Sequence, residues 1–345
     1  MPGSNYAIVA KARTMYGKRI TPKQYDEMIH CRSVQDVANY LKTKTHFAET
    51  LQEADTSNIH RGHLENLLRR SMFDQYAKLY TYISNGEDNL FHYIIMKEEI
   101  SEILRMVLLL KAGNAKSFII DLPGYLIRRS KINLLGISKV TRFDELVALL
   151  DGSDYAAILR RFQPAGEQAG IDYVGCEHAF YAYYYNKLFG LVQKNRNAAE
   201  ARELKNLVRV QIEILNIEHI YRAISYLDIP KEKIVHSLYP YYYHLSANTL
   251  EEMMACKDQS ALDQILVQTV YYQKFYGQNY PYIEDYTKRF VHQMSRRNLH
   301  FYTSAPLIFY SYYNISQIEL QNIITIIEGI RYQVPENEIK AKIIQ

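Results

Sequence analysis

The sequence Glu319-Leu320-Gln321-Asn322-Ile323, near the end of the chain, indicates how the chain is built, because copies of it recur. Glu213-Ile214-Leu215-Asn216-Ile217 matches it, and Glu99-Ile100-Ser101-Glu102-Ile103 matches it more loosely. The intervals between the three Glu residues are 114 and 106 residues (213 − 99 and 319 − 213). A near-constant period indicates a chain built from copies of one unit. We take five residues as landmarks of this repeat: Glu99, Glu213, Glu319, Asn216 and Asn322.

Each repeated Glu lies on or beside an apolar helix stripe. An Ile follows it by four positions and an apolar residue by seven, and such positions share one helical face. One interpretation is a half-exposed carboxylate at the edge of the stripe. Another is a structural Glu paired with a cation, since a buried unpaired carboxylate is costly. The candidate cations on neighbouring long helices are Arg69, Arg70, Arg296 and Arg297. A catalytic or ion-carrying Glu is the third alternative, but three quasi-equivalent copies favour a structural role.

The remaining pattern predicts an all-α protein. Apolar residues recur at helical spacing, and Thr21-Pro22 is typical of an N-cap followed by Pro in the first turn. Within each unit, the pattern predicts short helices, followed by a long helix and then by the helix that carries the landmark Glu. The long helices are expected over 63–83, 177–192 and 282–299. Unit boundaries near 112–115 and 228–230 divide the chain into helical repeats 1–115, 116–227 and 228–345, with joins too short to act as flexible linkers.

Composition limits the classes of function. Of the 345 residues, 48% are hydrophobic, which is enough to form hydrophobic cores. The net charge is only +4, so the charge of the chain does not indicate nucleic-acid binding. Three separated cysteines indicate a reducing compartment. We expect no signal peptide and no transmembrane segment, because the longest apolar run ends at Lys111 after five residues (106–110). Thirty-two Tyr residues favour Tyr-faced helices over the alternative of a base-stacking surface.

Motifs that carry chemistry are missing from the sequence. It contains neither a phosphate-binding loop nor a GxGxxG motif. Glu27 and His30 match one half of a carboxylate-bridged di-iron site, but no second Glu-x-x-His follows. We therefore predict no catalytic, cofactor-binding or metal-binding residues, and the sequence makes no positive case for an enzyme.

The C-terminal residues do suggest a family. The pattern Tyr312-x-Asn314-Ile315-x-x-Ile318-Glu319-Leu320-x-Asn322-Ile323-x-x-Ile326-Ile327-x-Gly329, followed by Val334-Pro335-Glu336-x-x-Ile339, resembles the signature of the C-type subunit of A/V-type rotary ATPases, the d-type subunit of eukaryotic vacuolar enzymes. The N-terminal Tyr6-Ala7-x-x-Ala10-x-Ala12-Arg13 is also similar to that family. The chain departs from it at Ser316 and Gln317, where the family usually has Lys-Glu, and at Ile324, where it usually has Arg.

This resemblance implies a funnel-like, pseudo-threefold arrangement of the three repeats and a non-catalytic central-stalk role without cofactors. One end would sit on the cytoplasmic mouth of the membrane rotor ring, and the other would receive the central shaft of D and F type subunits. The protein would be cytoplasmic and peripheral on the membrane sector, transmitting torque for ATP-coupled proton or sodium transport. The alternative is a helical-repeat scaffold unrelated to rotary ATPases.

Basic segments are the candidate partner surfaces, although ordinary solvated basic faces are the other interpretation. These candidates are Lys11, Arg13, Lys18, Arg19, Arg128 and Arg129.

Overall fold

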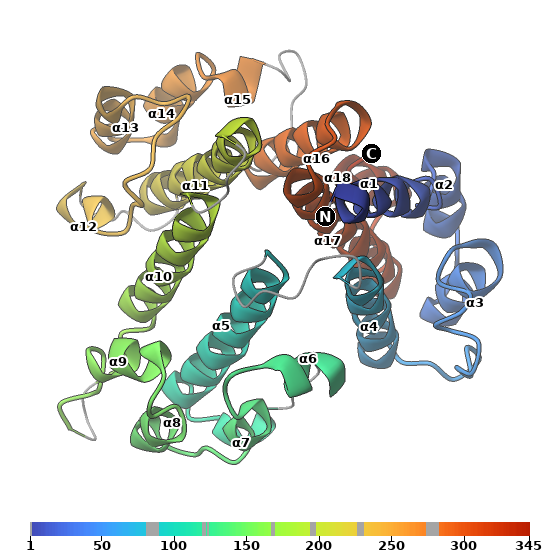
Figure 1. Ribbon diagram of the computed structural model, residues 1–345, viewed down its shortest axis with the longest axis horizontal. Helices are drawn as coiled ribbons and strands as arrows, with labels where there is room; N and C mark the ends of the chain where they lie inside the picture. Colours follow the sequence, from blue (N-terminus) through green and yellow to red (C-terminus); the bar gives the residue numbers. More distant parts are fainter. Residues whose placement is uncertain are drawn as a thin grey trace. The chain divides into compact units, whose positions relative to one another are not determined.

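The computed structural model describes residues 2–80, 90–118, 122, 124–166, 170–193, 198–225, 231–273 and 283–345. Within these residues every regular element is helical, which confirms the all-α prediction (Figure 1). The chain divides into two compact units. The larger unit comprises 1–84 and 197–345, and the smaller unit comprises 85–196. These bounds differ from those of the three predicted repeats, and the division into repeats stays a prediction.

The smaller unit is organised around two long helices, α5 (Leu90–Lys111) and α10 (Tyr173–Gln193), which pack along each other. Tyr93 on α5 donates a hydrogen bond from its hydroxyl to the Lys187 carbonyl on α10, at 2.7 Å. Short helices lead from one long helix to the other, each contacting the next from α7 onward. They are η1 (Ala115–Ser117), α6 (Gly124–Arg129), α7 (Leu134–Ile137), α8 (Phe143–Leu149) and α9 (Asp154–Arg160).

The larger unit surrounds α17 (Ala305–Arg331), which contains the opening sequence stretch and is buried over most of its length. Helices from both ends of the chain contact it, as Figure 1 shows for α1 and α16. From the N-terminal part these are α1 (Pro2–Tyr16), α2 (Pro22–Ile29), α3 (Val34–Lys44) and α4 (Arg61–Tyr80). From the C-terminal part they are α11 (Ala198–Ser225), α16 (Ile283–Phe301) and α18 (Glu336–Lys342).

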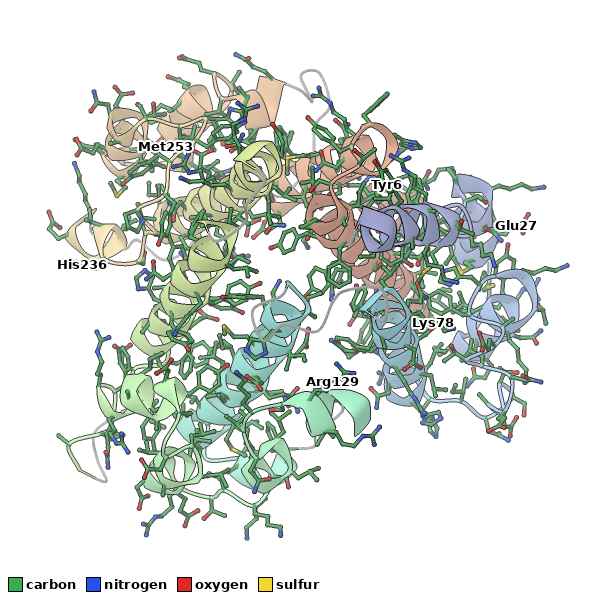
Figure 2. All side chains as sticks on the ribbon, in the orientation of Figure 1. Tyr6, Glu27, Lys78, Arg129, His236 and Met253 are labelled. Atoms are coloured by element: carbon green, nitrogen blue, oxygen red, sulfur yellow. The ribbon has the colours of Figure 1, made fainter. Side chains whose placement is uncertain are left out.

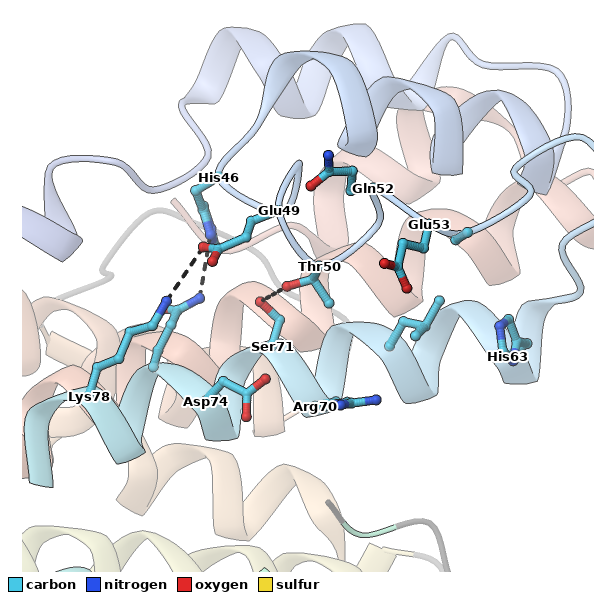
Figure 3. Close-up of a pocket in the computed structure, with 13 residues that line it drawn as sticks. His46, Glu49, Thr50, Gln52, Glu53, His63, Arg70, Ser71, Asp74 and Lys78 are labelled. Carbon is cyan, nitrogen blue, oxygen red and sulfur yellow. Dashed lines mark hydrogen bonds and ion pairs between the residues drawn. The ribbon is translucent and has the colours of Figure 1, made fainter. Parts of the chain in front are cut away.

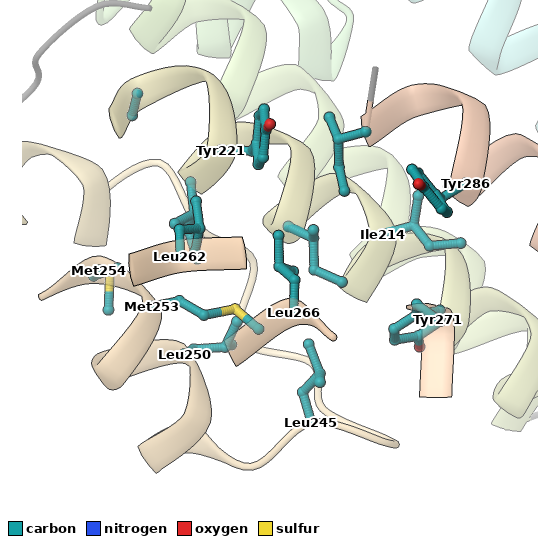
Figure 4. Close-up of a cluster of buried hydrophobic side chains, with 14 of the residues drawn as sticks. Ile214, Tyr221, Leu245, Leu250, Met253, Met254, Leu262, Leu266, Tyr271 and Tyr286 are labelled. Carbon is teal, nitrogen blue, oxygen red and sulfur yellow. The ribbon is translucent and has the colours of Figure 1, made fainter. Parts of the chain in front are cut away.

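A second core of the larger unit lies between α11, α16 and four short helices (Figure 4). The short helices are α12 (Lys231–Val235), α13 (Ala247–Met254), α14 (Gln259–Leu266) and α15 (Val270–Gln273). Ile214 and Tyr221 from α11 meet Met253 and Leu266 from the short helices in this cluster. Apolar residues recur at helical spacing in these short helices, so each helix has an apolar face, and that face packs toward α11.

Local capping explains where the short helices begin. Thr21 is the N-cap of α2, as the Thr21-Pro22 pattern predicted, and it also forms a capping box with Gln24. Ser246 accepts from the Thr249 N–H ahead of α13.

The predicted boundary at 228–230 lies outside the described residues. Within the described part of the chain, no helix is both long enough and apolar enough to cross a bilayer.

Candidate functional site

The three landmark Glu residues are buried, with only 2% (Glu99), 0% (Glu213) and 4% (Glu319) of their surface exposed. They occupy α5, α11 and α17. The interpretation of half-exposed carboxylates at the edge of a helix stripe is therefore wrong. A buried carboxylate needs hydrogen-bond donors or a counter-charge, so its partners define the local structure.

Glu99 in the smaller unit accepts three hydrogen bonds. The Ser130 hydroxyl (2.6 Å) and the Lys131 backbone N–H (3.0 Å) reach its Oε1 from the segment ahead of α7. The Tyr155 hydroxyl on α9 reaches its Oε2 at 2.6 Å. Burial, followed by the Glu99 charge, raises the pKa of Tyr155, so this phenol keeps its proton and remains a donor.

Glu213 in the larger unit accepts from three consecutive backbone N–H groups. These belong to Tyr243, His244 (2.9 Å to Oε1) and Leu245 (2.9 Å), just ahead of α13. The Tyr271 hydroxyl on α15 donates to the other oxygen. Burial and the Glu213 charge raise the pKa of Tyr271, so this phenol also remains a donor.

Glu319 is the centre of a charged cluster. Its Oε1 accepts from the Ile20 backbone N–H at 2.9 Å, and its Oε2 contacts the Arg19 guanidinium and His46 Nε2, the latter at 3.0 Å. Burial opposes ionisation of this carboxyl, but the Arg19 charge and the hydrogen bond from His46 outweigh it and lower the pKa to about 2. Glu319 is therefore a carboxylate at neutral pH.

The three sites share one plan. Each Glu holds the backbone ahead of a short helix and also a ring side chain after it. The backbone donor and the ring are 26 residues apart around Glu319 (46 − 20) and around Glu213 (271 − 245), and 24 apart around Glu99 (155 − 131). Glu99 and Glu213 each reach their backbone donor 32 residues ahead. Glu99 and Glu213 thus each contact the predicted repeat that follows, whereas Glu319 contacts the first repeat.

The partner cation was assigned wrongly from the sequence. Arg69, Arg70, Arg296 and Arg297 lie on long helices, whereas the cation at Glu319 comes from the loop between α1 and α2. Tertiary contact between segments 300 residues apart makes this pair, which sequence proximity could not reveal. No local pattern in the sequence relates Arg19 to Glu319.

The landmark Asn residues hold the backbone in a second, paired way. Asn216 Nδ2 donates to the Tyr239 carbonyl and its Oδ1 accepts from the Tyr239 N–H, both at 2.9 Å. Asn322 does the same with Ile344, at 2.7 and 3.1 Å. Both amides are buried. At the matching position of the first copy, Glu102 contacts Arg105 on the same helix.

The predicted partner-surface residues have different environments. The Arg13 guanidinium donates to the Leu299 carbonyl (2.7 Å) and the Tyr302 carbonyl (2.7 Å) at the C-terminal end of α16, where a cation is favoured. The Arg19 side chain is only 9% exposed and faces Glu319, so it offers little surface to a partner. Lys18 is exposed and Lys11 is half-buried. Arg128 and Arg129 are exposed on α6, and Figure 2 labels Arg129.

A polar cleft of about 640 Å³ adjoins the Glu319 cluster, between α4 and the segment 46–54 (Figure 3). His46 lines it together with charged side chains of both signs, and Lys78 contacts Glu49 at 3.5 Å. Burial raises the pKa of the Asp74 carboxyl in this cleft. Acidic and basic groups are mixed along the walls, so the cleft does not select a ligand of one charge.

The Glu27-x-x-His30 half-motif is engaged in surface contacts. Glu27 accepts from the Tyr40 hydroxyl at 2.6 Å, and His30 Nε2 lies 3.4 Å from Glu336. No group of three His, Cys, Asp or Glu side chains among the described residues is arranged to hold a metal ion.

Comparison with known proteins shows to which family the chain belongs. A family model described as ATP synthase (C/AC39) subunit matches residues 8–342. The chain belongs to this family. It is also similar to the C subunit of the A-type ATP synthase of Methanobrevibacter smithii, with 26% identity over 231 residues, which cover 64% of this chain and 56% of that protein. The match thus spans little more than half the length of that relative. The resemblance found in the C-terminal and N-terminal motifs is confirmed.

Departures from the usual C/AC39 pattern leave the Glu319 cluster intact. Ser316 is buried, and its hydroxyl contacts the Arg19 guanidinium and donates to the Tyr312 carbonyl at 2.8 Å. Gln317 and Ile324 are half-buried on the same helix. The counter-charge of Glu319 comes from outside α17, so the altered positions do not remove its ion pair.

Proposed function

We propose that this C/AC39 family member is a non-catalytic central-stalk component of a rotary ATPase or ATP synthase. It would link a shaft of D and F type subunits to the ion-carrying membrane ring, and transmit torque for ATP-coupled proton or sodium transport. Membership of the family over residues 8–342 is the observation that carries this proposal. The protein would then be cytoplasmic and peripheral on the membrane sector.

We further propose that three helical repeats, 1–115, 116–227 and 228–345, form a pseudo-threefold, funnel-like arrangement. The support is the shared plan of the Glu sites, in which Glu99 and Glu213 hold the following repeat and Glu319 holds the first. Such an arrangement resists relative movement of the repeats, because separating two of them would break the hydrogen bonds that a buried carboxylate accepts. Stiffness of this kind suits an element that transmits torque.

Recovery of partners from native membranes tests the proposal. A tagged chain expressed in its own host should co-purify ring and shaft subunits after mild detergent extraction. Cross-linking should then place both partners within reach of this chain. If the tagged chain recovers neither ring nor shaft subunits, the central-stalk role is wrong, and the alternative of a scaffold outside rotary ATPases is favoured.

A further inference from the structure

The positive charge of the chain is concentrated in one stretch of the smaller unit. Between Glu102 and Asp144 the sequence has eight Lys and Arg residues and one acidic residue, Asp121, which gives a net charge of +7 (8 − 1). The rest of the chain has 33 basic (41 − 8) and 36 acidic residues (37 − 1), so it is slightly acidic. A local excess of this size attracts an anionic partner at short range.

Most of these cations lie on the surface without an ionic partner. Arg105 and Arg142 form ion pairs with Glu102 and Asp144, so their charges are compensated. The other six are exposed: Lys111, Lys116, Arg128, Arg129, Lys131 and Lys139. Within the described part of the chain, the four Lys residues and Arg128 form no ion pair. Their charges are therefore available to a partner outside the chain.

The exposed cations come from segments that pack around α5. Helix α5 contacts both η1 and α7, and Figure 1 shows α7 beside it. The Arg105 guanidinium lies over the Phe118 ring, 4.4 Å from its centroid, which fixes the end of η1 against α5. Glu99 accepts from the Ser130 hydroxyl and the Lys131 N–H, so the segment between α6 and α7 is also held to α5. The cations thus belong to one anchored region of the unit.

Two exposed leucines lie among these cations. Leu108 is 48% exposed and Leu135 is 57% exposed. Lys111 follows Leu108 by three positions and Lys139 follows Leu135 by four, so each leucine shares a helical face with a cation. The Lys139 N–H donates to the Gly136 carbonyl at 3.0 Å, which continues the turn of α7. We call the six exposed cations together with the two leucines the basic end of the smaller unit.

The side chains of the basic end suit an anionic membrane surface better than a nucleic acid or an acidic protein. Lys and Arg near an anionic bilayer each add attraction, and aliphatic side chains enter the boundary between headgroups and acyl chains. Nucleic-acid surfaces use exposed rings for stacking, and protein interfaces are enriched in aromatic residues and depleted in Lys. The aromatic side chains described in this stretch, Phe118 and Phe143, are both buried.

We propose that the basic end binds peripherally to a membrane rich in anionic phospholipids, with its cations at the headgroup phosphates and Leu108 and Leu135 in the boundary below them. No covalent bond is made or broken. This lipid contact is direct and does not pass through another subunit, so it goes beyond the proposed central-stalk role. Failure to recover ring and shaft subunits would leave the lipid contact standing, and absence of lipid binding would leave the central-stalk role standing.

Co-sedimentation of the full chain with vesicles tests the proposal. Vesicles of phosphatidylcholine mixed with phosphatidylserine should bind the chain, less so as salt rises, and vesicles of phosphatidylcholine alone should not. Lys131→Gln/Lys139→Gln should weaken binding about twenty-five-fold, because each cation near the surface contributes about fivefold. Lys44→Gln/Lys257→Gln is the matched control, since it removes the same charge from exposed positions of the larger unit and should leave binding unchanged.

Two outcomes of this experiment would overturn the proposal. Equal weakening by the two double variants would mean that the net charge of the chain, and not the basic end, attracts the vesicles. Absence of binding to the mixed vesicles would exclude the lipid contact, and binding of poly-glutamate in its place would assign the basic end to an acidic protein. The fold does not depend on the altered side chain at Lys131, because Glu99 accepts from its backbone N–H.

A second measurement tests the leucines without removing charge. The sequence contains no Trp, so Leu135→Trp places a single indole at the basic end. Its fluorescence should shift to the blue on mixed vesicles and should be quenched by brominated phospholipids. Val267→Trp, at a position 42% exposed in the larger unit, should show neither change. If Leu135→Trp binds the vesicles without either change, the leucines do not enter the bilayer and the proposed mode of binding is wrong.

Discussion

Glu319 Oε1 accepts a hydrogen bond from the Ile20 backbone N–H at 2.9 Å, across 299 residues of chain. The neighbouring Arg19 contacts the other oxygen of the same carboxylate. The beginning of the chain and its last long helix are thus held by one buried side chain. This contact makes the N-terminal short helices part of the core around α17.

Replacing Arg19 should be strongly destabilising. Arg19→Met leaves the buried Glu319 carboxylate without its counter-charge, and removing one partner of a buried pair costs about 3–5 kcal/mol. Urea unfolding followed by circular dichroism measures the loss. The double variant Arg19→Met/Glu319→Gln should recover part of it, whereas Arg142→Met, which breaks an exposed pair with Asp144, should leave the stability nearly unchanged. Equal costs for the two single variants would contradict a buried pair.

Acid should weaken the larger unit through Glu319. Its folded pKa of about 2 lies below the ordinary value of 4.5, so its stabilising contribution is complete above pH 4.5 and is lost as the pH falls through 2. The shift corresponds to about 3 kcal/mol. Hydrogen exchange at the Ile20 and Tyr25 amides, measured between pH 5 and 2, should report this loss. In Glu319→Gln the same amides should lose that part of the pH dependence; an unchanged profile would assign the acid response to other groups.

Glu213→Gln should destabilise the short helices that follow it. The carboxylate accepts from three backbone N–H groups and from Tyr271, whereas a Gln side chain would turn an NH₂ group toward some of those donors. Leaving such groups unpaired costs about 1–3 kcal/mol. Hydrogen exchange at His244 and Leu245 should accelerate. Glu251→Gln on the exposed side of α13 is the control and should leave these amides protected.

Gly329→Ala should strain the contact between α17 and α18. A Cβ there would lie 2.5 Å from Ile339 Cδ1 and 2.6 Å from its Cγ1, so the buried Ile339 side chain must change rotamer or α18 must move away from α17. Overpacking of this kind costs about 1–3 kcal/mol, read as a lower melting temperature. Gly190→Ala within α10 meets nothing within 4 Å and should be neutral or stabilising. Ile339→Ala should partly rescue Gly329→Ala; failure to do so would show that the clash lies elsewhere.

The sequence predicted the helices and the landmark residues because both depend on local patterns. Apolar spacing placed α4, α10 and α16 near their observed positions, and capping chemistry located the start of α2. Repetition singled out the three Glu residues without any structure. The cation at Glu319 could not be predicted, because which Arg reaches a buried carboxylate depends on how distant helices pack.

Residue spacing alone predicted an all-helical chain, its family signature and the Glu that recurs on three long helices, followed by Asn three positions later in two of them. The partners of those residues became clear only from the packing of the helices. Glu99 and Glu213 bind backbone N–H groups and a Tyr, whereas Glu319 adds Arg19 and His46. The reason is physical: a carboxylate taken out of water accepts whatever donors the packing brings within about 3 Å, and the packing arises from contacts across hundreds of residues.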